Sequence, residues 1–393
     1  MNAYLTSVIE NVKKKHSNEP EFVQTVEEVF SSLEPVIEKH PEYEKVDLLN
    51  RMVEPERMFT FRVSWEDDQG QWHTNIGYRC QFNGALGPYK GGLRFQANVY
   101  PGIIKFLGFE QIFKNSLTGL PIGGGKGGAD FDPAGKSDAE IMRFCQAYMQ
   151  ALYRYIGPDV DVPAGDMGVG GREIGYLFGE YRRLKGAWEN GVLTGKGFSY
   201  GGSLIRPEAT GYGAVYYLQN VLEHEGERIA GKTIACAGFG NVTWGICKKA
   251  TQLGAKVVTL SGPDGYIYDP DGVATEEKIA YLVEMRSSGR NRVQDYAEKF
   301  GVEFFPGEKP WGVKADVVMP SAMQNDVHME QAKQIAANGV KYYIEVANMP
   351  TTNDALRFLM EQPGMIVAPS KAVNAGGVAT SALEMAQNSE RLG

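Results

Sequence analysis

Apolar positions recur at helical spacing in the first fifty residues, which are otherwise polar. Residues three and four positions apart fall on one face of an α-helix, so this pattern predicts two or three amphipathic helices. The recurring positions are Val8, Ile9 and Val12, then Phe22, Val23, Val26, Val29 and Phe30.

Two runs rich in aromatic and β-branched residues follow the helical region. They read RMFTFRVSWED and WHTNIGYRCQF, and turn-forming residues 67–70 separate them. This arrangement predicts a β-hairpin. From Leu86 to Gly202, glycine-rich segments, which we interpret as loops, alternate with helical runs such as IIKFLGFEQIFKNSL. The alternation predicts an α/β domain.

The pattern changes after Ser203, where short, continuous apolar runs alternate with helical spacers. Such runs are typical of strands buried on both faces of a parallel, doubly wound sheet. We therefore predict a two-domain α/β protein, with a mixed sheet in domain one and a Rossmann-type sheet in domain two. Domain one comprises 1–202 and a returning tail, 371–393, and domain two comprises 203–370. The apolar runs are TIACAGFG, KVVTLSG, ADVVMPSA, KYYIEVAN and MIVAPS.

Composition excludes several classes of protein. The chain has 393 residues, of which 43% are hydrophobic and 22% charged. A chain of this length and composition can bury a sizeable core without disulfides or metals. Forty basic against 48 acidic residues leave a net charge of −8, so a nucleic-acid partner is not expected. The chain lacks a membrane-spanning run and a secretory signal, and a cytoplasmic location is expected. The five histidines lack ligand spacing, so we expect no metal site, and Cys236 and Cys247 should be buried free thiols.

A glycine turn after the first strand of domain two suggests a dinucleotide site. Gly238 permits a tight turn, and Gly240 lets backbone N–H groups approach a pyrophosphate at the positive end of the following helix. Thr243 stands at the third position of the fingerprint, where glycine or alanine is usual. The cofactor-binding residues predicted in this turn are Gly238, Phe239, Gly240, Asn241 and Val242.

Asp264 follows the second strand of domain two, in the sequence Gly262-Pro263-Asp264. An acid here would accept hydrogen bonds from the adenosine ribose hydroxyls and repel a 2′-phosphate, which favours NAD over NADP. The same residues also make a good surface turn.

Domain one holds three candidate lysines: Lys90 in GPYKGGLRF, Lys114 in FEQIFKNS and Lys126 in PIGGGKGGADFD. Lys114 alone fits a solvated helix lysine. Glycines flank Lys126, so the backbone can fold closely around it, and withdrawal from water would lower its pKa until it acts as a base. Asp166, in DVPAGDMGVGGREIG, is either a helix N-cap or the partner of a lysine in proton transfer.

These motifs, together with GGSLIRPEATGYG and SKAVNAGGVATS, resemble those of hexameric glutamate dehydrogenases. The resemblance extends over the whole chain. The stretch SGPDGYIYDP is similar to the NAD-dependent clostridial type. The resemblance implies a homohexamer that catalyses reversible NAD-dependent oxidative deamination of L-glutamate to 2-oxoglutarate and ammonia.

The resemblance also implies a role for each matching residue. Lys126 activates water and Asp166 shuttles protons. Lys90, Thr194 and Ser381 hold the γ-carboxylate of the substrate. The α-carboxylate is held by Gln111 and Lys114, and the residues implied near the cofactor or cleft are Arg206, Thr210, Asn241 and Asn348.

Three alternatives stay open at this point. The enzyme could use NADP instead of NAD. It could act on leucine, valine or phenylalanine, although Lys90 beside an apolar substrate would gain nothing. It could also be a catalytically impaired dinucleotide-binding homologue, because the family continues with more helix beyond SERLG, whereas intact Lys126 and Asp166 argue for a catalyst.

Overall fold

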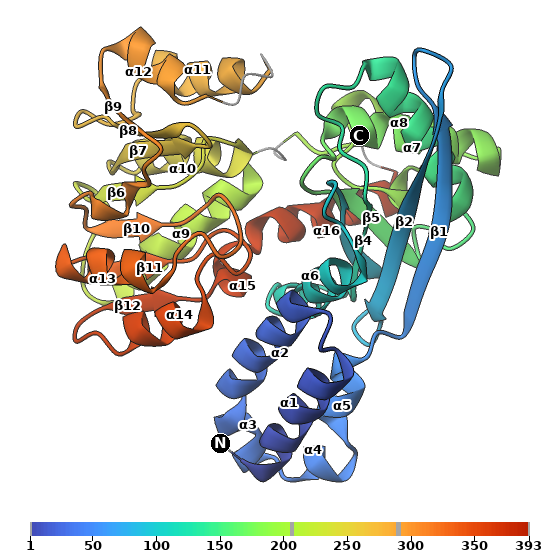
Figure 1. Ribbon diagram of the computed structural model, residues 1–393, viewed down its shortest axis with the longest axis horizontal. Coiled ribbons are helices and arrows are strands. Elements are labelled where there is room, and N and C mark those ends of the chain that lie inside the picture. Colours follow the sequence, from blue (N-terminus) through green and yellow to red (C-terminus); the bar gives the residue numbers. More distant parts are fainter. Residues whose placement is uncertain (1, 205–207, 288–291, 392–393) are drawn as a thin grey trace. The chain divides into compact units, whose positions relative to one another are not determined.

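The computed structural model describes residues 2–204, 208–287 and 292–391 (Figure 1). The chain divides into two compact units. Unit 1 comprises Met1–Leu204 and Val378–Gly393, and unit 2 comprises Ile205–Gly377. Arg206, which the family resemblance implies near the cofactor or cleft as a substrate-binding residue, lies outside the described residues.

Unit 1 begins with helices where the apolar periodicity predicts them. The predicted apolar positions of α1 and α2 are buried, except for Val23, which is half-buried. Three further helices follow, each of four to six residues. Helices this short cannot display a repeating apolar face. The apolar pattern therefore underestimates how many helices the start of the chain forms. The helices are α1 (Ala3–Lys15), α2 (Pro20–Ser32), α3 (Glu34–Lys39), α4 (Glu42–Lys45) and α5 (Leu48–Val53).

A five-stranded mixed sheet forms the centre of unit 1, in the order β1-β2-β4-β3-β5. The predicted hairpin is confirmed, because β1 pairs antiparallel with β2 from Arg57↔Gln81 to Glu66↔Trp72. β2 is antiparallel to β4, whereas β3 runs parallel to both β4 and β5. The strands are β1 (Arg57–Glu66), β2 (Trp72–Asn83), β3 (Tyr89–Phe95), β4 (Gly124–Ala129) and β5 (Asp161–Gly165).

The interpretation of the glycine-rich segments as loops is wrong for three of them, because they form β3, β4 and β5. Glycine allows these strands an unusually close approach. A Cβ atom added at Gly91 would lie 1.7 Å from the carbonyl oxygen of Gly125, and one at Gly92 would lie 2.6 Å from that of Gly165. These glycines therefore allow neighbouring backbones of the sheet to come into close contact.

We expect Gly91→Ala to lower the free energy of unfolding by about 3 kcal/mol or more, the upper end of the cost of overpacking. The methyl group would meet backbone, which cannot move aside as a side chain can. Gly179→Ala is the matched control. That glycine lies exposed in a helix, and no described heavy atom lies within 4 Å of the added Cβ. Gly179→Ala should raise the free energy of unfolding by about 0.5–1 kcal/mol, because alanine favours the helix more than glycine does. Denaturant unfolding of both variants checks the prediction, and an equal effect of the two would contradict it.

Four longer helices complete unit 1. α7 and α8 cover the sheet through a core that includes Phe95, Phe144, Tyr148 and Leu177. α16 begins at the end of unit 2 and continues into unit 1. The helices are α6 (Pro101–Ser116), α7 (Asp138–Leu152), α8 (Gly171–Lys185) and α16 (Gly376–Ser389), with short 3₁₀ turns at Asn190–Val192 and Phe198–Tyr200.

Unit 2 contains a seven-stranded sheet in the order β12-β11-β10-β6-β7-β8-β9. The five predicted strands are confirmed, and they pair in parallel. The antiparallel strands β8 and β9 are not predicted, because each has four residues and β9 is only partly buried. The strands are β6 (Thr233–Cys236), β7 (Lys256–Gly262), β8 (Gly265–Tyr268), β9 (Glu303–Pro306), β10 (Val317–Met319), β11 (Tyr342–Ile344) and β12 (Ile366–Ala368).

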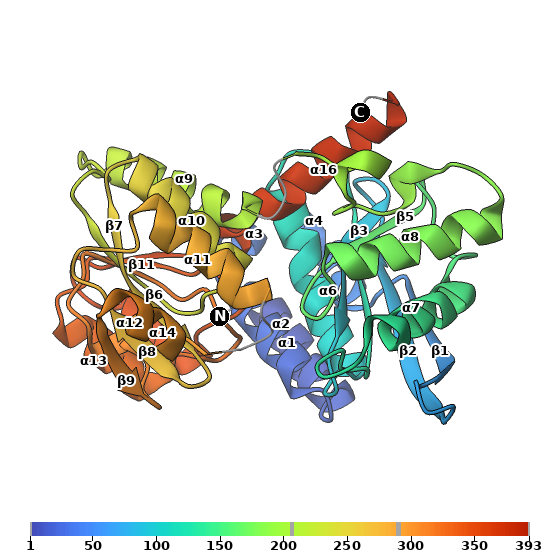
Figure 2. The ribbon, with the colours of Figure 1, turned by 90° about the horizontal axis from the view of Figure 1, so that it is seen from above.

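Helices cover both faces of this sheet, which confirms the doubly wound architecture (Figure 2). Ile234 and Cys236 of β6 pack towards α9, α10, α11 and α12. Ala235, between them, packs on the opposite face with α13 and α14. The helices are α9 (Ala209–His224), α10 (Asn241–Gln252), α11 (Glu276–Ser287), α12 (Gln294–Phe300), α13 (Met329–Ala337), α14 (Asn353–Met360) and α15 (Ser370–Val373).

The four cysteines are free and buried, as predicted for Cys236 and Cys247. Within the described ranges, none of the helices is both long and apolar enough to cross a bilayer.

Candidate active site

Lys126 and Asp166 come together in unit 1 as a buried ion pair. The Lys126 Nζ atom lies 2.7 Å from Asp166 Oδ2, and the two side chains are 5% and 18% exposed. Lys126 lies in β4, Asp166 follows β5, and β3 runs between these strands. Gly92 of β3 leaves room for the pair, because a Cβ atom there would lie 2.9 Å from the Cβ of Asp166.

Arg94 is a third charged group at this pair, although its motif GPYKGGLRF does not indicate that role. Its Nε atom lies 3.4 Å from Asp166 Oδ2, and its side chain is buried. Lys90, Gly92 and Arg94 alternate along β3, and alternate residues of a strand face the same side. That alternation is the signal that would have located Arg94, had the segment been recognised as a strand.

Burial and neighbouring charge shift the pKa values of this pair. Burial lowers the pKa of Lys126; the Asp166 carboxylate opposes this and the Arg94 charge adds to it, so the pKa lies below the ordinary lysine value. Burial alone would raise the pKa of Asp166, but the charges of Lys126 and Arg94 outweigh it and hold that pKa well below its usual range. The site thus combines an ionised carboxylate with a lysine whose proton is more easily lost than usual.

Gln111 and Lys114 both lie on α6, and Lys90 lies in β3. The side chain of Gln111 donates a 2.7 Å hydrogen bond to Asn115 Oδ1. Asn115 Nδ2 donates in turn to the backbone oxygen of Lys90, at 3.1 Å. Asn115, whose role is not evident from the motif FEQIFKNS, therefore connects Gln111 of α6 to β3.

Thr194 lies next to β5 and presents a buried hydroxyl. Its backbone N–H donates to the Pro163 carbonyl at 3.0 Å. Its Oγ1 atom is buried and has no hydrogen-bond partner within the described residues. A buried hydroxyl without a partner is costly, so this atom marks a place where a ligand oxygen fits. Ser381 is buried in α16.

The turn between β6 and α10 has the geometry that the sequence predicts for Gly238, with a φ of +83°. Gly240 is the N-cap of α10, and no described heavy atom lies within 4 Å of a Cβ added there. An open approach to the first turn of a helix suits a pyrophosphate. These residues therefore fit a dinucleotide.

Thr243, the departure from the fingerprint, has a structural explanation. Its hydroxyl donates to the backbone oxygen of Ala237 at 3.1 Å and so ties α10 to the end of β6. The close contact between helices is made instead by Gly211 and Gly245. A Cβ atom added at Gly211 would lie 2.3 Å from the Val242 oxygen, and one at Gly245 would lie 2.7 Å from the Glu208 oxygen.

Asp264 lies after β7, as predicted, and it also binds the backbone at the start of α12. Its two carboxylate oxygens accept hydrogen bonds from the backbone N–H groups of Val293 and Gln294, both at 3.0 Å. This contact fixes the start of α12 and brings the backbone next to Arg292 close to Asp264. The sequence around Asp264 contains no basic residue, so sequence reasoning could not foresee Arg292 here.

Two further cofactor candidates lie elsewhere in unit 2. Thr210 occupies the first turn of α9. The side chain of Asn348 accepts a 2.9 Å hydrogen bond from Asn374 Nδ2, which also donates to the Val346 oxygen at 2.8 Å. Asn374 lies in the motif SKAVNAGGVATS, which by itself indicates no role for this side chain, and it positions Asn348.

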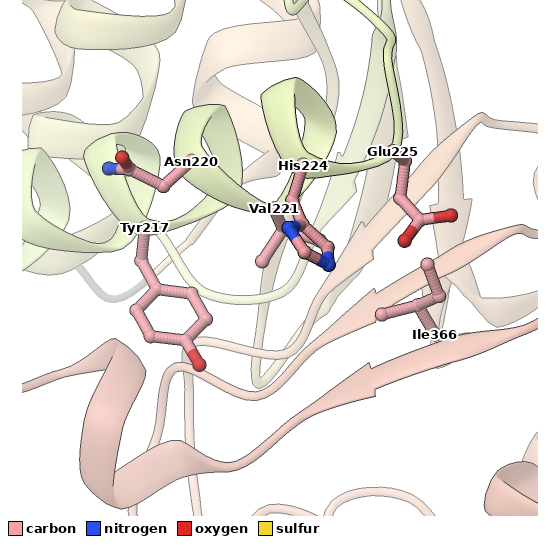
Figure 3. A pocket seen from close by; sticks show the side chains of 6 residues that line it. All are labelled: Tyr217, Asn220, Val221, His224, Glu225 and Ile366. Carbon is pink, nitrogen blue, oxygen red and sulfur yellow. The ribbon is translucent and has the colours of Figure 1, made fainter.

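A separate pocket of about 370 Å³ lies beside α9, and none of the predicted site residues lines it (Figure 3). Figure 3 shows Tyr217 and His224 reaching from α9 towards the space next to β12. Its lining residues are Tyr217, Asn220, Val221, His224, Glu225 and Ile366.

A doubly wound sheet with a glycine turn between β6 and α10, joined to a unit with a buried lysine–aspartate pair, is the arrangement expected of a two-domain dinucleotide-dependent dehydrogenase. The family model for Glutamate/Leucine/Phenylalanine/Valine dehydrogenase matches residues 201–393. The model for the dimerisation domain of Glu/Leu/Phe/Val dehydrogenases matches residues 55–183. The chain belongs to this family.

Individual relatives agree with the family assignment. The NAD-specific glutamate dehydrogenase of Clostridium symbiosum is 70% identical over 392 residues, covering 100% of this chain and 87% of that protein. The NADP-specific glutamate dehydrogenase of Haemophilus influenzae is 54% identical, covering 99% and 86%. A solved glutamate dehydrogenase structure superposes with a TM-score of 0.98 at 70% identity, covering 100% of this chain and 87% of the other. The Plasmodium falciparum enzyme gives 0.94 at 48% identity, covering 99% and 82%. The expected resemblance to the clostridial type is confirmed.

Proposed function

We propose that this protein is a glutamate dehydrogenase that catalyses the reversible NAD-dependent oxidative deamination of L-glutamate to 2-oxoglutarate and ammonia. The observation that carries the proposal is the buried ion pair of Lys126 and Asp166, 2.7 Å apart, in a chain 70% identical to an NAD-specific glutamate dehydrogenase. Proton transfer at such a pair is the chemistry that deamination requires in addition to hydride transfer.

The substrate is held through its two carboxylates. Lys90, Thr194 and Ser381 bind the γ-carboxylate, and the buried Thr194 hydroxyl without a protein partner in the described chain supports this assignment. Gln111 and Lys114 of α6 bind the α-carboxylate. The family resemblance alone assigns Arg206 to substrate binding. Fixing both carboxylates orients the Cα–H bond for reaction.

Unit 2 binds the cofactor, and NAD, when bound, accepts the hydride from Cα of the substrate. Asp264 places negative charge at the end of β7, which disfavours a 2′-phosphate and supports NAD over NADP. The proposed cofactor-binding residues are Thr210, Gly238, Phe239, Gly240, Asn241, Val242, Asp264 and Asn348.

The chain supplies the proton transfers. Loss of hydride leaves an iminium carbon on the substrate. Lys126 in its amine form takes a proton from water as that water attacks this carbon, and a carbinolamine results. Asp166 relays the proton that Lys126 has taken up to the departing nitrogen. The carbinolamine hydroxyl then gives its proton to the Lys126 amine as the carbon–nitrogen bond breaks, so that ammonia leaves and the carbonyl of 2-oxoglutarate forms. The two groups lie at hydrogen-bonding distance in the structure, which permits direct proton transfer between them.

Assembly and location complete the proposal. The match to a dimerisation domain over residues 55–183 supports a homo-oligomer, which we take to be a hexamer on the resemblance to hexameric glutamate dehydrogenases. The proposed location is the cytoplasm, because all four cysteines are free thiols, which suits a reducing compartment.

The pKa of Lys126 gives the activity a defined pH dependence. Because amine is the working form, kcat/KM for glutamate should rise with pH through the lowered pKa of Lys126. The Arg94 charge contributes to that lowering, so Arg94→Gln should move the rising limb to higher pH than in wild type. Titration of the glutamate amine is common to both enzymes and cancels in the comparison. Arg143→Gln, at a partly exposed ion pair with Asp68, is the control and should leave the limb in place. A limb that stays fixed or moves down in Arg94→Gln would contradict the assignment.

The proposed activity is tested by the absorbance of reduced nicotinamide, with purified protein, glutamate, and NAD or NADP in parallel. Reduction of NAD well above NADP is expected. A folded protein that binds the dinucleotide but reduces neither form would refute the proposal.

A further inference from the structure

A buried ionic cluster joins α16 to the loop that carries Thr194. Lys196 Nζ lies 2.8 Å from Glu384 Oε1, and both side chains are 0% exposed. The same Nζ donates to Asn388 Oδ1 at 2.9 Å and to the Leu193 carbonyl oxygen. All three protons of the ammonium group thus have an acceptor, so the side chain has a single orientation.

The cluster also binds the backbone of the loop. Glu384 Oε2 accepts a 2.9 Å hydrogen bond from the Gly195 N–H. Gly195 has a φ of +87°, in the left-handed region that favours glycine, so the chain turns there between Thr194 and Lys196. Asn388 Nδ2 donates to the Gly201 oxygen at 2.7 Å, which fixes the far end of the loop.

The cluster is adjacent to two of the proposed γ-carboxylate ligands. Lys196 follows Thr194 by two residues. Glu384 follows Ser381 by three residues on α16, so both lie on one face of the helix. The ion pair therefore joins the two segments that carry Thr194 and Ser381, two residues from the first and three residues from the second.

Stability alone does not explain this arrangement. Burial lowers the pKa of Lys196 against the opposing effect of Glu384, which shows that removal of the charges from water carries a cost. Replacement of a buried ion pair by apolar residues of similar size is often neutral or stabilising. An apolar contact, however, has no directional preference and would let α16 shift along the loop. The directed hydrogen bonds of this cluster fix one position of α16 relative to the loop.

We propose that Lys196, Glu384 and Asn388 are positioning residues that fix Thr194 relative to Ser381 and thereby set selectivity for a substrate with a γ-carboxylate. The inference rests on the proposed function. It adds three residues that need not touch the substrate and act through the two that do.

The test compares glutamate with norvaline, which has the same carbon chain without the γ-carboxylate. In the double variant Lys196→Met/Glu384→Leu, both charges are removed and neither is left unpaired. We expect its KM for glutamate to rise about tenfold or more, since small misplacements of binding groups have effects of this order. The KM for norvaline and both kcat values should change far less. Glu384→Gln keeps an acceptor oxygen and should show a smaller shift in the same direction.

Lys278→Met is the matched control, because Lys278 pairs with Asp269 at 2.6 Å within unit 2. It should lower the melting temperature without changing the ratio of kcat/KM for glutamate to that for norvaline. If the double variant does not fold, Glu384→Gln decides the test. An unchanged ratio in the active variants, or an equal loss for both substrates, would overturn the inference. A wild-type enzyme without preference for glutamate would instead refute the proposed function.

Discussion

Asp166→Ser is expected to lower kcat for glutamate oxidation by roughly 10²- to 10⁴-fold, the range that a positioned proton-transfer group contributes. The substitution removes the proton relay and also the carboxylate that lies 2.7 Å from Lys126 Nζ. Lys126 and Arg94, the charged groups that contact Asp166, are both cations. The water-activating lysine therefore also loses its orienting partner.

The dissociation constant for NAD should stay unchanged in this variant, because the fingerprint turn lies in unit 2 and Asp166 in unit 1. Steady-state kinetics and a dinucleotide-binding titration measure the two quantities. Asp159→Ser, at an exposed aspartate just before β5, is the matched control and should be as active as wild type. Turnover of Asp166→Ser at the wild-type rate would remove Asp166 from the mechanism.

Lys90→Leu is expected to lower kcat/KM for glutamate by about 30-fold or more, which corresponds to the 2–5 kcal/mol lost when one partner of a buried charge pair is truncated. Lys90 is buried in β3, so the γ-carboxylate would lose its cation in a place with little access to water. Norvaline has no charge at that end, so kcat/KM for norvaline should stay at the wild-type value or rise.

The ratio of the two specificity constants is the quantity that decides this prediction. Lys136→Leu serves as a control, because Lys136 lies over the rings of Trp65 and Phe131, where it has no proposed role in substrate binding. It should leave the ratio at the wild-type value. If Lys90→Leu weakens glutamate and norvaline equally, the γ-carboxylate assignment is wrong.

Much of unit 2 is predictable from sequence, because its central strands are continuous apolar runs. Unit 1 is harder to predict for a physical reason. Its strands β3, β4 and β5 contain glycines that usually indicate loops, but here they allow backbones to approach, as at Gly91 against Gly125. That requirement becomes visible only once the strands are paired.

Lys126 and Asp166, which the structure brings together, can be singled out from sequence because each stands in a distinctive glycine-rich motif. Their neighbour Arg94 stands in GPYKGGLRF and the connecting residue Asn115 in FEQIFKNS, but nothing in these motifs indicates the roles of the two side chains. Only the pairing of strands and the packing of α6 identify those roles. The double contact of Asp264 with the start of α12 likewise joins residues 29 and 30 positions apart. Contacts of this kind depend on tertiary structure and leave no local pattern.

The central claim is that the hydride passes from Cα of glutamate to NAD at this site. Glutamate deuterated at Cα, incubated with the protein and NAD, tests it directly when the reduced cofactor and the keto acid are analysed by mass spectrometry. We predict deuterated reduced nicotinamide together with an equal amount of 2-oxoglutarate. Reduced cofactor without deuterium, or no 2-oxoglutarate from a folded protein that binds NAD, would contradict the account.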